Sequence, residues 1–266
     1  MAGTEPIGTS GAIATVEYVR HRNALLVRAR LTDLFLDYYL HLAFHGIQLA
    51  PEHDRLLKAT ISAFTLHCAS RPRTEHIAWT INLQEPRLNL FAAGDNEDGN
   101  ITGRVFTEHV KASPRNLLYI ETVHKRDPAR RSVVEFSGSD IFEAAEKFYS
   151  QSEQRPARFF DLGGEEYALL ASHPDCDIPW LQRVSLEGLR ELATHEIVVP
   201  MERRLYRWQC GCNEQRIFRI LAPAMRQDPD ELFHGEDALR MECPRCGALY
   251  RVGREALEAY VAQERS

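Results

Sequence analysis

The sequence predicts an α+β fold: a sheet-rich N-terminal domain with packed helices, a partly helical connector, and a small C-terminal four-cysteine zinc domain. The first observation behind this prediction is that apolar residues recur at every second position through residues 77–136, which is typical of strands. The second is that helical repeats precede and follow that region. The third is a pair of short cysteine motifs near the end of the chain. We place the three parts at residues 1–156, 157–208 and 209–266.

The composition is that of an ordinary globular protein. A chain of 266 residues with 44% hydrophobic content is long enough for one large domain, or for one large and one small. A formal charge of −6 provides no overall basic field for a nucleic-acid backbone, so nucleic acid is a poor first candidate for a partner. The N-terminus lacks a basic segment followed by an apolar one, and no run of about 18 apolar residues occurs. We therefore expect a soluble, cytoplasmic protein without a membrane partner.

The first predicted elements are a strand and two helices. After a Gly/Thr-rich start, residues 25–31 alternate in the manner of a half-buried strand. Thr32 is then expected to cap a helix that ends at Gly46, and a second helix is expected over residues 51–70. One face of this second helix carries Leu57, Ile61, Phe64 and Cys68. Cys68 is therefore expected to be a small buried apolar residue.

The middle of the chain is expected to form a sheet. Alternation over residues 77–83 and 88–92 predicts a hairpin, and a polar turn at 94–100 leads to a third strand. Two further short strands are expected in the segments NLLYIETV and SVVEF. Asp140 and Glu143 then form a capping box for a helix that closes the N-terminal domain.

Residues 157–208 combine one predicted short helix, from Ser185 to Glu196, with apolar fragments that prolines interrupt. Such a segment gains order only when it packs against a folded neighbour, so we expect a metastable connector. Within it, Cys176 lies close in sequence to His173 and to two aspartates. This group is either a second metal site or a polar proline turn, and we favour the turn.

The four remaining cysteines predict a metal centre. One residue separates Cys210 from Cys212, and two residues separate Cys243 from Cys246. Two ligand pairs brought together by the intervening chain form a closed tetrahedral site, and thiolates are common ligands of Zn²⁺. A two-residue gap followed by glycine is typical of a zinc knuckle, because it turns backbone N–H groups toward the sulfurs. We therefore assign all four cysteines as ligands of one Zn²⁺ ion in the reduced state.

The one-residue spacing of Cys210 and Cys212 has a chemical consequence. A disulfide between them closes a very small ring, which strains the bond and makes it easy to reduce. Structural zinc contributes about 10–16 kcal/mol in small modules, whereas a whole domain is stable by only about 5–15 kcal/mol. Loss of the metal is therefore expected to unfold the tail. These properties suit an oxidant sensor, although an inert zinc ribbon satisfies the same cysteine pattern.

Basic residues lie close to the cysteines in the sequence. Arg207, Arg240, Arg245, Arg251 and Arg254 are near enough to offset the negative charge of four thiolates around one Zn²⁺ ion. These arginines either hold the sulfurs as reactive thiolates or form a solvated face. The sequence leaves both interpretations open.

Three stretches resemble the heat-shock protein 33 family of chaperones. The order of CxC, an intervening segment, CxxCG, an aromatic residue and a strand resembles that family's redox-switch domain. YSQSEQ at residues 149–154 resembles its Tyr-Tyr-x-x-Ser-Glu-Gln segment, and residues 79–106 resemble its hairpin followed by a glycine-containing turn. The matches extend over most of residues 24–255. Departures at residues 85–93 and in TEHVKASP after Phe106 concern the surface of the N-terminal domain rather than the four cysteines.

The resemblance implies an ATP-independent holdase. In such proteins the reduced, zinc-bound form is inactive, and oxidation releases the ion. The resemblance implies disulfides that join Cys210 with Cys212 and Cys243 with Cys246. The tail and the connector then lose structure, and apolar surface becomes available to unfolded or partly folded client proteins. The same resemblance implies a monomer in the reduced state and a homodimer in the oxidised state.

Two other functions are compatible with the cysteines. The first is a zinc-ribbon protein that associates with nucleic acid without redox switching; RMECPRCGALYRVGR is locally basic, and a salt-sensitive affinity would distinguish this alternative. The second is a thiol-disulfide exchange enzyme that uses Cys243 and Cys246, against which zinc occupancy argues. No H-E-x-x-H, G-x-S-x-G, P-loop or G-x-G-x-x-G motif occurs in the sequence. We therefore expect no enzyme activity.

Overall fold

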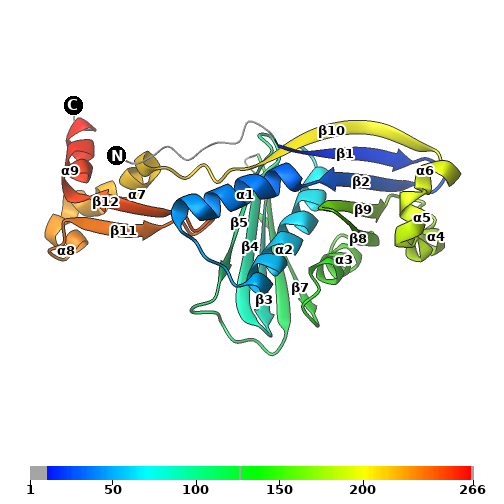
Figure 1. Ribbon diagram of the computed structural model, residues 1–266, viewed down its shortest axis with the longest axis horizontal. Coiled ribbons are helices and arrows are strands. Elements are labelled where there is room, and N and C mark those ends of the chain that lie inside the picture. The colour runs from blue at the N-terminus through cyan, green and yellow to red at the C-terminus, as the bar shows by residue number, and fades with distance from the viewer. Residues whose placement is uncertain (1–10, 126, 265–266) are drawn as a thin grey trace.

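The computed structural model describes residues 11–125 and 127–264 and has an elongated shape (Figure 1). A large sheet occupies the centre, a cysteine-containing module lies at one end, and a group of short helices lies at the other. Runs of antiparallel strands alternate with separate groups of helices, so the predicted α+β class is confirmed. Within this described part, no helix combines the length and the hydropathy that a membrane span requires.

Ten strands form the central sheet. They are β1 (Ala12–Val19), β2 (Ala24–Arg30), β3 (Glu75–Gln84), β4 (Arg87–Asp95), β5 (Asn100–Phe106), β6 (Asn116–His124), β7 (Arg130–Phe136), β8 (Ala157–Gly163), β9 (Glu166–Ser172) and β10 (Val198–Trp208). Their order in the sheet is β7-β6-β3-β4-β5-β10-β1-β2-β9-β8. β10 pairs antiparallel with β1, but it pairs parallel with β5 at only two positions, Arg207 opposite Asn100 and Trp208 opposite Ile101. β10 is therefore the strand that joins two antiparallel groups into one sheet.

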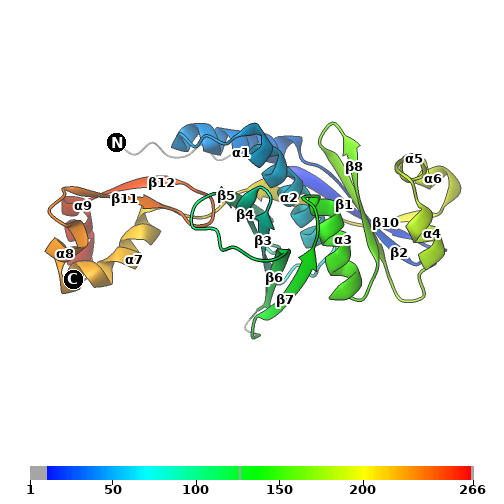
Figure 2. The ribbon, with the colours of Figure 1, turned by 90° about the horizontal axis from the view of Figure 1, so that it is seen from below.

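Three helices pack on one face of the sheet: α1 (Thr32–His45), α2 (Pro51–Ala69) and α3 (Ile141–Gln151) (Figures 1 and 2). Their buried side chains and those of both strand groups form one continuous core. Gly46 ends α1 in the left-handed conformation, as predicted. The Asp140 side chain accepts hydrogen bonds from the first turn of α3, which confirms it as a capping residue.

The start of α1 differs from the prediction. Thr32 is the first helical residue rather than the cap, and Leu31 occupies the cap position without a side-chain hydrogen bond. Leu31 is fully buried, and its backbone N–H donates to the Glu165 carbonyl (2.9 Å). Packing at the end of β2 therefore determines where this helix begins, and no capping side chain is needed.

Residues 157–208, the expected connector, contain β8, β9, three short helices and β10. β9 pairs with β2 and β8 pairs with β9, so the sheet continues past residue 156. The helices are α4 (Ile178–Arg183), α5 (Leu186–Arg190) and α6 (Leu192–His195). The single helix predicted over 185–196 is present as α5 and α6, which a turn at Glu191 separates.

We call α4–α6 the cover, because they pack on the face of the sheet opposite α1–α3. Side chains alternate along a strand, so one face of β2 and β9 contributes to the main core and the other contributes to a second core under the cover. The cover supplies Leu181, Val184, Leu189 and Leu192, and the strands supply Val19, Ala24, Leu26, Phe160, Ala168 and Leu170. The second core is thus formed largely by the face of the sheet and the cover.

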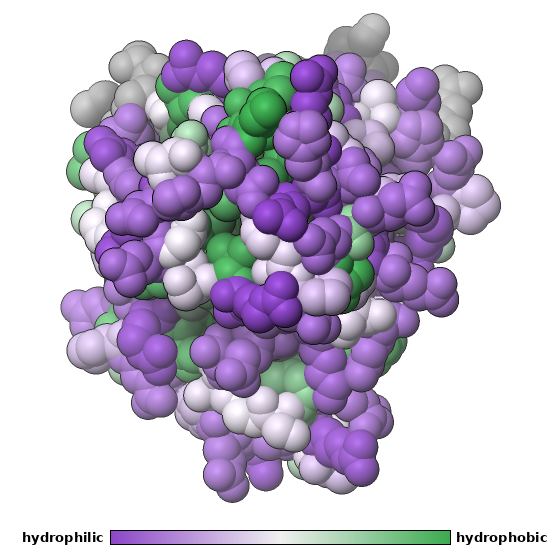
Figure 3. Space-filling model, turned by 90° about the vertical axis from the view of Figure 1, so that its right-hand side faces the viewer, coloured by the Kyte–Doolittle hydropathy of each residue, from purple (hydrophilic) through white to green (hydrophobic). Residues whose placement is uncertain are grey.

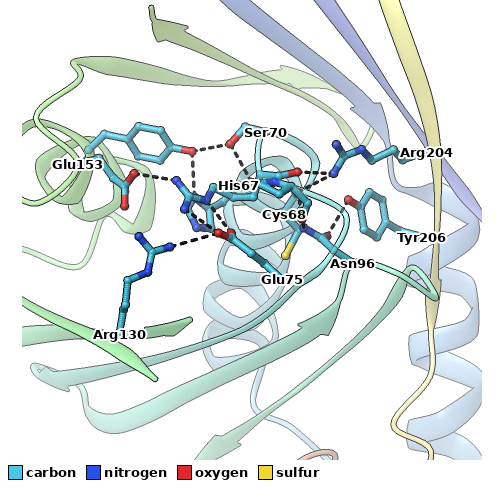
Figure 4. Close-up of polar contacts among 12 residues, drawn as sticks. His67, Cys68, Ser70, Glu75, Asn96, Arg130, Glu153, Arg204 and Tyr206 are labelled. Carbon is cyan, nitrogen blue, oxygen red and sulfur yellow. Dashed lines mark hydrogen bonds and ion pairs between the residues drawn. The ribbon is translucent and has the colours of Figure 1, made fainter. Parts of the chain in front are cut away.

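A buried polar network fastens β10 to the end of α2 (Figure 4). The Arg204 guanidinium, on β10, donates to the carbonyls of Cys68 (3.2 Å) and Arg71 (2.6 Å). Asn96 Nδ2 also donates to the Cys68 carbonyl (2.8 Å), and the Tyr206 hydroxyl donates to Asn96 Oδ1 (3.1 Å). Contacts from β10 and from the turn after β4 therefore converge at the end of α2. We call this network the β10 anchor.

The same polar region extends to α3. Arg71 forms ion pairs with Glu75 (2.8 Å) and Glu153 (2.8 Å), and the second of these residues lies in the YSQSEQ segment. His67 Nδ1 lies 2.9 Å from the Tyr149 hydroxyl. Burial lowers the pKa of His67 well below its usual value, so this ring is neutral at pH 7.

The C-terminal module has its own small core. It contains α7 (Glu214–Gln227), α8 (Pro229–Phe233), the two-stranded ribbon β11 (Ala238–Glu242) and β12 (Leu249–Gly253), and α9 (Arg254–Gln263). Apolar residues of α7, α8, β12 and α9 pack together, separate from the cores of the large sheet. Figures 1 and 2 both place this module at the end of the molecule opposite the cover.

Candidate metal centre

The first cysteine pair lies between the end of β10 and the start of α7. The Gln209 backbone N–H donates to the Ile101 carbonyl (2.9 Å), which holds the chain against β5 directly before Cys210. Gly211 has a φ of 70°, a conformation that glycine adopts without steric cost. The Asn213 side chain caps α7. The single residue between the two cysteines is therefore a left-handed turn that is fixed by a strand on one side and a helix on the other.

The second cysteine pair forms the tip of the β11–β12 ribbon. The Cys243 N–H donates to the Ala248 carbonyl (2.9 Å), and the Gly247 N–H donates to the Cys243 carbonyl (2.9 Å). Gly247 also has a positive φ, of 77°. The CPRCG turn is thus closed by two backbone hydrogen bonds. Cys246 is almost fully buried.

The four sulfurs lie together although they come from separate segments. All four Sγ atoms lie within 4.8 Å of one another. Cys210 Sγ lies 3.6 Å from Cys243 Sγ, and Cys212 Sγ lies 3.5 Å from Cys246 Sγ. These distances exceed a disulfide bond of about 2.05 Å, so the cysteines are free thiols or thiolates. Tetrahedral zinc with Zn–S bonds of about 2.3 Å requires sulfurs about 3.8 Å apart. The cluster can therefore hold a metal ion, and its sulfur donors and spacing fit zinc.

The sulfurs control one another's ionisation. Hydrogen bonds from Cys210, and then from Cys212 and Cys246, hold the pKa of Cys243 far below its usual range. The Arg245 backbone N–H adds to this effect. The pKa values of Cys246 and Cys212 are raised, in each case first of all by the hydrogen bond with Cys210. The cluster therefore favours a mixed thiol and thiolate state, from which a bound cation would displace the remaining protons.

Two side chains outside the cysteine motifs are placed to affect the sulfurs. The Tyr250 hydroxyl donates to Cys212 Sγ (3.2 Å). Arg216 Nη1 donates to the Gly211 carbonyl (2.7 Å), which holds the CxC turn against the first turn of α7. A cavity of about 610 Å³ borders Cys210 and is also lined by Arg245 and Asp95. The cavity therefore gives a small molecule from solvent an approach to the cluster at Cys210.

The arginines that the sequence singled out have different environments. Arg254 pairs with Asp230 (2.8 Å) and Glu258 (3.1 Å), so two carboxylates of the module itself balance its positive charge. Arg240 and Arg251 are exposed and lie opposite each other across the ribbon. Of the five arginines, including Arg207 on β10, Arg245 is the one that lines the cavity beside Cys210.

The other two cysteines lie away from the cluster. Cys68 is fully buried on α2, as predicted, and burial raises the pKa of its thiol. Cys176 is half-buried in a turn, where its N–H donates to the His173 carbonyl (3.1 Å). Over residues 11–125 and 127–264, no other group of three or more His, Cys, Asp or Glu side chains is arranged to hold a metal. The segment around Cys176 therefore forms a polar turn, the interpretation that the sequence favours.

Sequence reasoning did not identify two residues that contact the knuckle from the N-terminal domain. Arg104, on β5, and His41, on α1, hydrogen-bond to the carbonyls of Cys243 and Cys246. Both lie more than a hundred residues from the cysteines in the sequence, and no local pattern distinguishes them from other polar residues on a strand or a helix.

Comparisons with known proteins point to one family. No family model matches the chain. A curated relative, the 33 kDa chaperonin of Nitrosococcus oceani, is 22% identical over 189 residues, which cover 63% of this chain and 64% of that protein. The match thus spans less than two thirds of the relative's length. The structure of this chain matches the crystal structure of the 33 kDa chaperonin, a heat shock protein 33 homolog, from Thermotoga maritima with a TM-score of 0.70. The predicted similarity to the heat-shock protein 33 family is confirmed.

The structural likeness to heat-shock protein 33 is nearly complete in extent. It covers 96% of this chain and 99% of the Thermotoga maritima chain, with 16% sequence identity. At that identity the comparison establishes the fold. The likeness therefore includes the large sheet, the segment 157–208 and the cysteine module as one continuous arrangement.

Proposed function

We propose that this protein is a redox-regulated, ATP-independent holdase, which binds unfolding proteins after its cysteines are oxidised and zinc is released. The observation that carries the proposal is the cluster of four sulfurs within 4.8 Å, in a chain that shares its fold with a 33 kDa chaperonin. The similar proteins are named as chaperones, and no enzyme motif occurs in the sequence. A non-enzymatic chaperone accounts for both facts.

In the reduced state, Cys210, Cys212, Cys243 and Cys246 would hold one Zn²⁺ ion. Bound zinc would supply a closed structural crosslink between the CxC turn and the knuckle. The module has only a small apolar core of its own, so the metal would contribute much of its stability. Loss of the ion would therefore unfold the module.

Oxidation would remove the ligands. Each disulfide forms from two thiols, whose two electrons and two protons pass to an oxidant such as hydrogen peroxide, which is reduced to water. In the structure Cys210 Sγ contacts Cys243 Sγ and Cys212 Sγ contacts Cys246 Sγ, and each contact joins the two different motifs. Once the metal is lost, however, the short loops keep Cys210 near Cys212 and Cys243 near Cys246, because closure of a short loop costs little entropy. We therefore propose that the disulfides form within each motif, between Cys210 and Cys212 and between Cys243 and Cys246.

The apolar surface to be exposed would lie under the cover. Arg28, on β2, donates to the Leu189 carbonyl (2.9 Å), and Arg158, on β8, donates to the Gln182 carbonyl (2.9 Å). Arg22 pairs with Asp177 (2.6 Å) at the start of the cover. The cover is thus held by a few hydrogen bonds and ion pairs, by its four buried apolar side chains, and by the partly buried ring of Trp180. Figure 3, which looks onto this end of the molecule, shows a mainly hydrophilic surface with separate hydrophobic patches. Removal of the cover would join them to a larger apolar face suited to unfolded clients.

The partners and location follow from the same proposal. The protein would act in the cytoplasm on unfolded or partly folded proteins, as a monomer while reduced and as a homodimer after oxidation. The test is to purify the reduced protein and follow its zinc content with a metal-reporter dye during treatment with peroxide or hypochlorite. Suppression of the aggregation of a model protein would be measured in parallel. We expect about one equivalent of zinc, released as anti-aggregation activity appears, and reversal by a reductant. Zinc that is retained, or released without a gain in activity, would contradict the proposal.

One observation favours a second function, a zinc ribbon that associates with nucleic acid. Arg240 and Arg251 lie directly opposite each other on the exposed ribbon, where two like charges repel unless an anion lies between them. Affinity of the reduced protein for single- or double-stranded nucleic acid that falls steeply with salt would support this function. Unchanged affinity after replacement of both arginines would exclude this surface.

A further inference from the structure

The knuckle is fastened to the N-terminal domain through the backbone of its own ligand residues. Arg104 Nη1 donates to the Cys243 carbonyl (2.9 Å), and Arg104 Nη2 pairs with Glu242 (2.7 Å). His41 Nε2 lies 3.0 Å from the Cys246 carbonyl. Because a carbonyl only accepts, His41 Nε2 must carry the proton in this contact. β5 and α1 therefore each hold one of the two cysteines that end the ribbon.

The contact surface around these bonds is closely fitted. A Cβ atom added at Gly247 would lie 3.3 Å from Ile47 Cδ1, so the turn lies directly against the segment that follows α1. The Leu249 N–H points to His45 Nδ1 (3.3 Å), one helical turn beyond His41. The Arg104 guanidinium also stacks on the Phe106 ring, 4.2 Å from its centroid. The side chain of Arg104 is consequently held by a residue of its own strand as well as by the module.

The other half of the cluster meets the same helix. The ring of Trp208, two residues before Cys210, lies 5.7 Å from the ring of His41. His41 is almost fully buried between that ring and the knuckle. Both cysteine motifs are therefore positioned relative to the end of α1, and a movement of the module away from α1 would separate them.

We propose that Arg104 and His41 form a docking latch, which makes metal retention in the four-cysteine cluster depend on its contact with β5 and α1. The inference rests on the proposed function only in requiring that zinc occupies the cluster. The latch holds the carbonyls of two ligand residues, so it keeps the knuckle turn in its ligating shape. Outer partners of this kind commonly alter metal affinity by about 10–100-fold when they are removed.

The coupling acts in both directions. If docking raises the affinity for the metal by some factor, the metal raises the affinity of docking by the same factor. A disulfide between Cys243 and Cys246 would change the turn that carries both carbonyls. Oxidation would then release the module from β5 and α1 at the same step in which it releases the ion. Arg104 and His41 are positioning residues, since they hold the carbonyls of two ligand residues.

The test compares zinc release from full-length reduced variants into an excess of a chelating dye, without any oxidant. Arg104→Met keeps the packing on Phe106 but removes both polar contacts, and we expect release about tenfold faster than from the unaltered protein. Glu242→Gln removes the exposed half of the ion pair and leaves the carbonyl bond, so we expect at most about a threefold effect. Arg115→Met, which removes the exposed pair with Glu135, is the matched control and should release zinc at the original rate.

Hydrogen exchange in the zinc-loaded state provides a second readout. Arg104→Met should speed exchange in residues 243–250 while β3 and β4 stay protected, which shows undocking rather than unfolding of the sheet. Zinc release and exchange equal to those of the unaltered protein would overturn the latch and leave the proposed function intact. An unaltered protein that binds no zinc would overturn both. His41→Phe, which keeps a ring beside Trp208, should reproduce the faster release, and an unchanged rate would remove His41 from the latch.

Discussion

The two halves of β10 are held in different ways, although they form one continuous strand. In the first half, Val199 and Met201 are exposed, and the pairing with β1 shifts register between Val16 and Glu17. In the second half, Arg204, Tyr206 and Trp208 are buried, and the first two belong to the β10 anchor. The strand is therefore loose at the end next to the cover and firm at the end next to the cysteines.

This difference bears on how a change at the cysteines reaches the cover. Cys210 follows β10 directly, and the cover precedes it, so β10 is the continuous chain between the two. Unfolding of the C-terminal module would act first on the firm half. The anchor therefore sets a threshold for release of the cover. Loss of the metal loosens the module, but the cover is released only when the hydrogen bonds of the anchor break as well. The loose half and the cover can then lose order without separation of the two strand groups.

The largest effect is expected from loss of a metal ligand. Cys243→Ser removes one thiolate and should abolish much of the stabilisation of about 10–16 kcal/mol that structural zinc provides. We expect reduced zinc content and rapid proteolysis within residues 209–264 even without oxidant. Hydrogen exchange should rise steeply there and only weakly at residues 204–208, where the anchor holds.

Cys68→Ala is the matched control for this ligand variant. Cys68 is fully buried, its pKa is raised by burial, and its anchor contacts are made by its carbonyl rather than its sulfur. The control should keep its zinc and its response to oxidant. A Cys243→Ser protein with full zinc content and unchanged protease resistance would show that the ligand assignment is wrong.

The next effect tests the anchor itself. Arg204→Met leaves the Arg71 carbonyl without its guanidinium donor and deprives Glu202 of its closest cation. Glu202 is half-buried and keeps Arg73 as a partner, so the cost comes mainly from the two carbonyls to which Arg204 donates. Because a buried acceptor that loses its donor costs about 1–3 kcal/mol, we expect a loss of about 3 kcal/mol in the free energy of unfolding. Denaturant titration measures the loss, and hydrogen exchange should become fast over both halves of β10.

Arg203→Met is the control for the anchor variant, since Arg203 is exposed and adjacent on the same strand. It should change stability by no more than about 0.5 kcal/mol. Combined with Cys243→Ser, Arg204→Met should open the cover more than the two single effects together, because both act on one path. Strict additivity in the double variant would mean that β10 does not connect the cysteines to the cover.

A smaller and more local effect is expected in the cover. Leu181 is fully buried on α4 in the second core, and its replacement by Ala should cost about 2–3 kcal/mol. The change should appear as faster exchange in residues 178–195, with the anchored half of β10 unaffected. Leu186→Ala, at an exposed position on α5, is the control and should have little effect. Faster exchange at residues 204–208 in Leu181→Ala would show that cover and anchor open as one unit.

The sequence predicts the parts of this arrangement that depend on local pattern. The spacing of Cys210, Cys212, Cys243 and Cys246 predicts a single metal cluster. Each short turn supplies two sulfurs, and a tetrahedral site needs four ligands, so the two turns have to meet. α2 and the β3–β4 hairpin follow from periodicity. β1 was not predicted, since small alanines at positions 12 and 14 alternate with Ile13, an apolar residue that is exposed, so the apolar pattern does not mark the buried face.

The contacts that organise the site lie beyond such patterns. Arg204 reaches the end of α2 across more than a hundred residues, and Arg104 reaches the knuckle across a similar separation. In the sequence both are ordinary arginines on strands, and only the order of strands in the sheet brings them to their carbonyls. The boundary at Leu31 has the same cause, because tertiary packing rather than a capping side chain determines it.

The smallest effect compares the two halves of β10 by single atoms. Tyr206→Phe removes the hydroxyl that donates to Asn96 and keeps the buried ring, so the expected cost is about 1 kcal/mol for one hydrogen bond. Met201→Thr, in the loose half, changes an exposed side chain and should cost no more than about 0.5 kcal/mol. Both are measured by the denaturant midpoint at constant m-value. Equal costs at the two positions would mean that the strand is held uniformly, and the threshold between the cysteines and the cover would then have to lie in the latch rather than in the anchor.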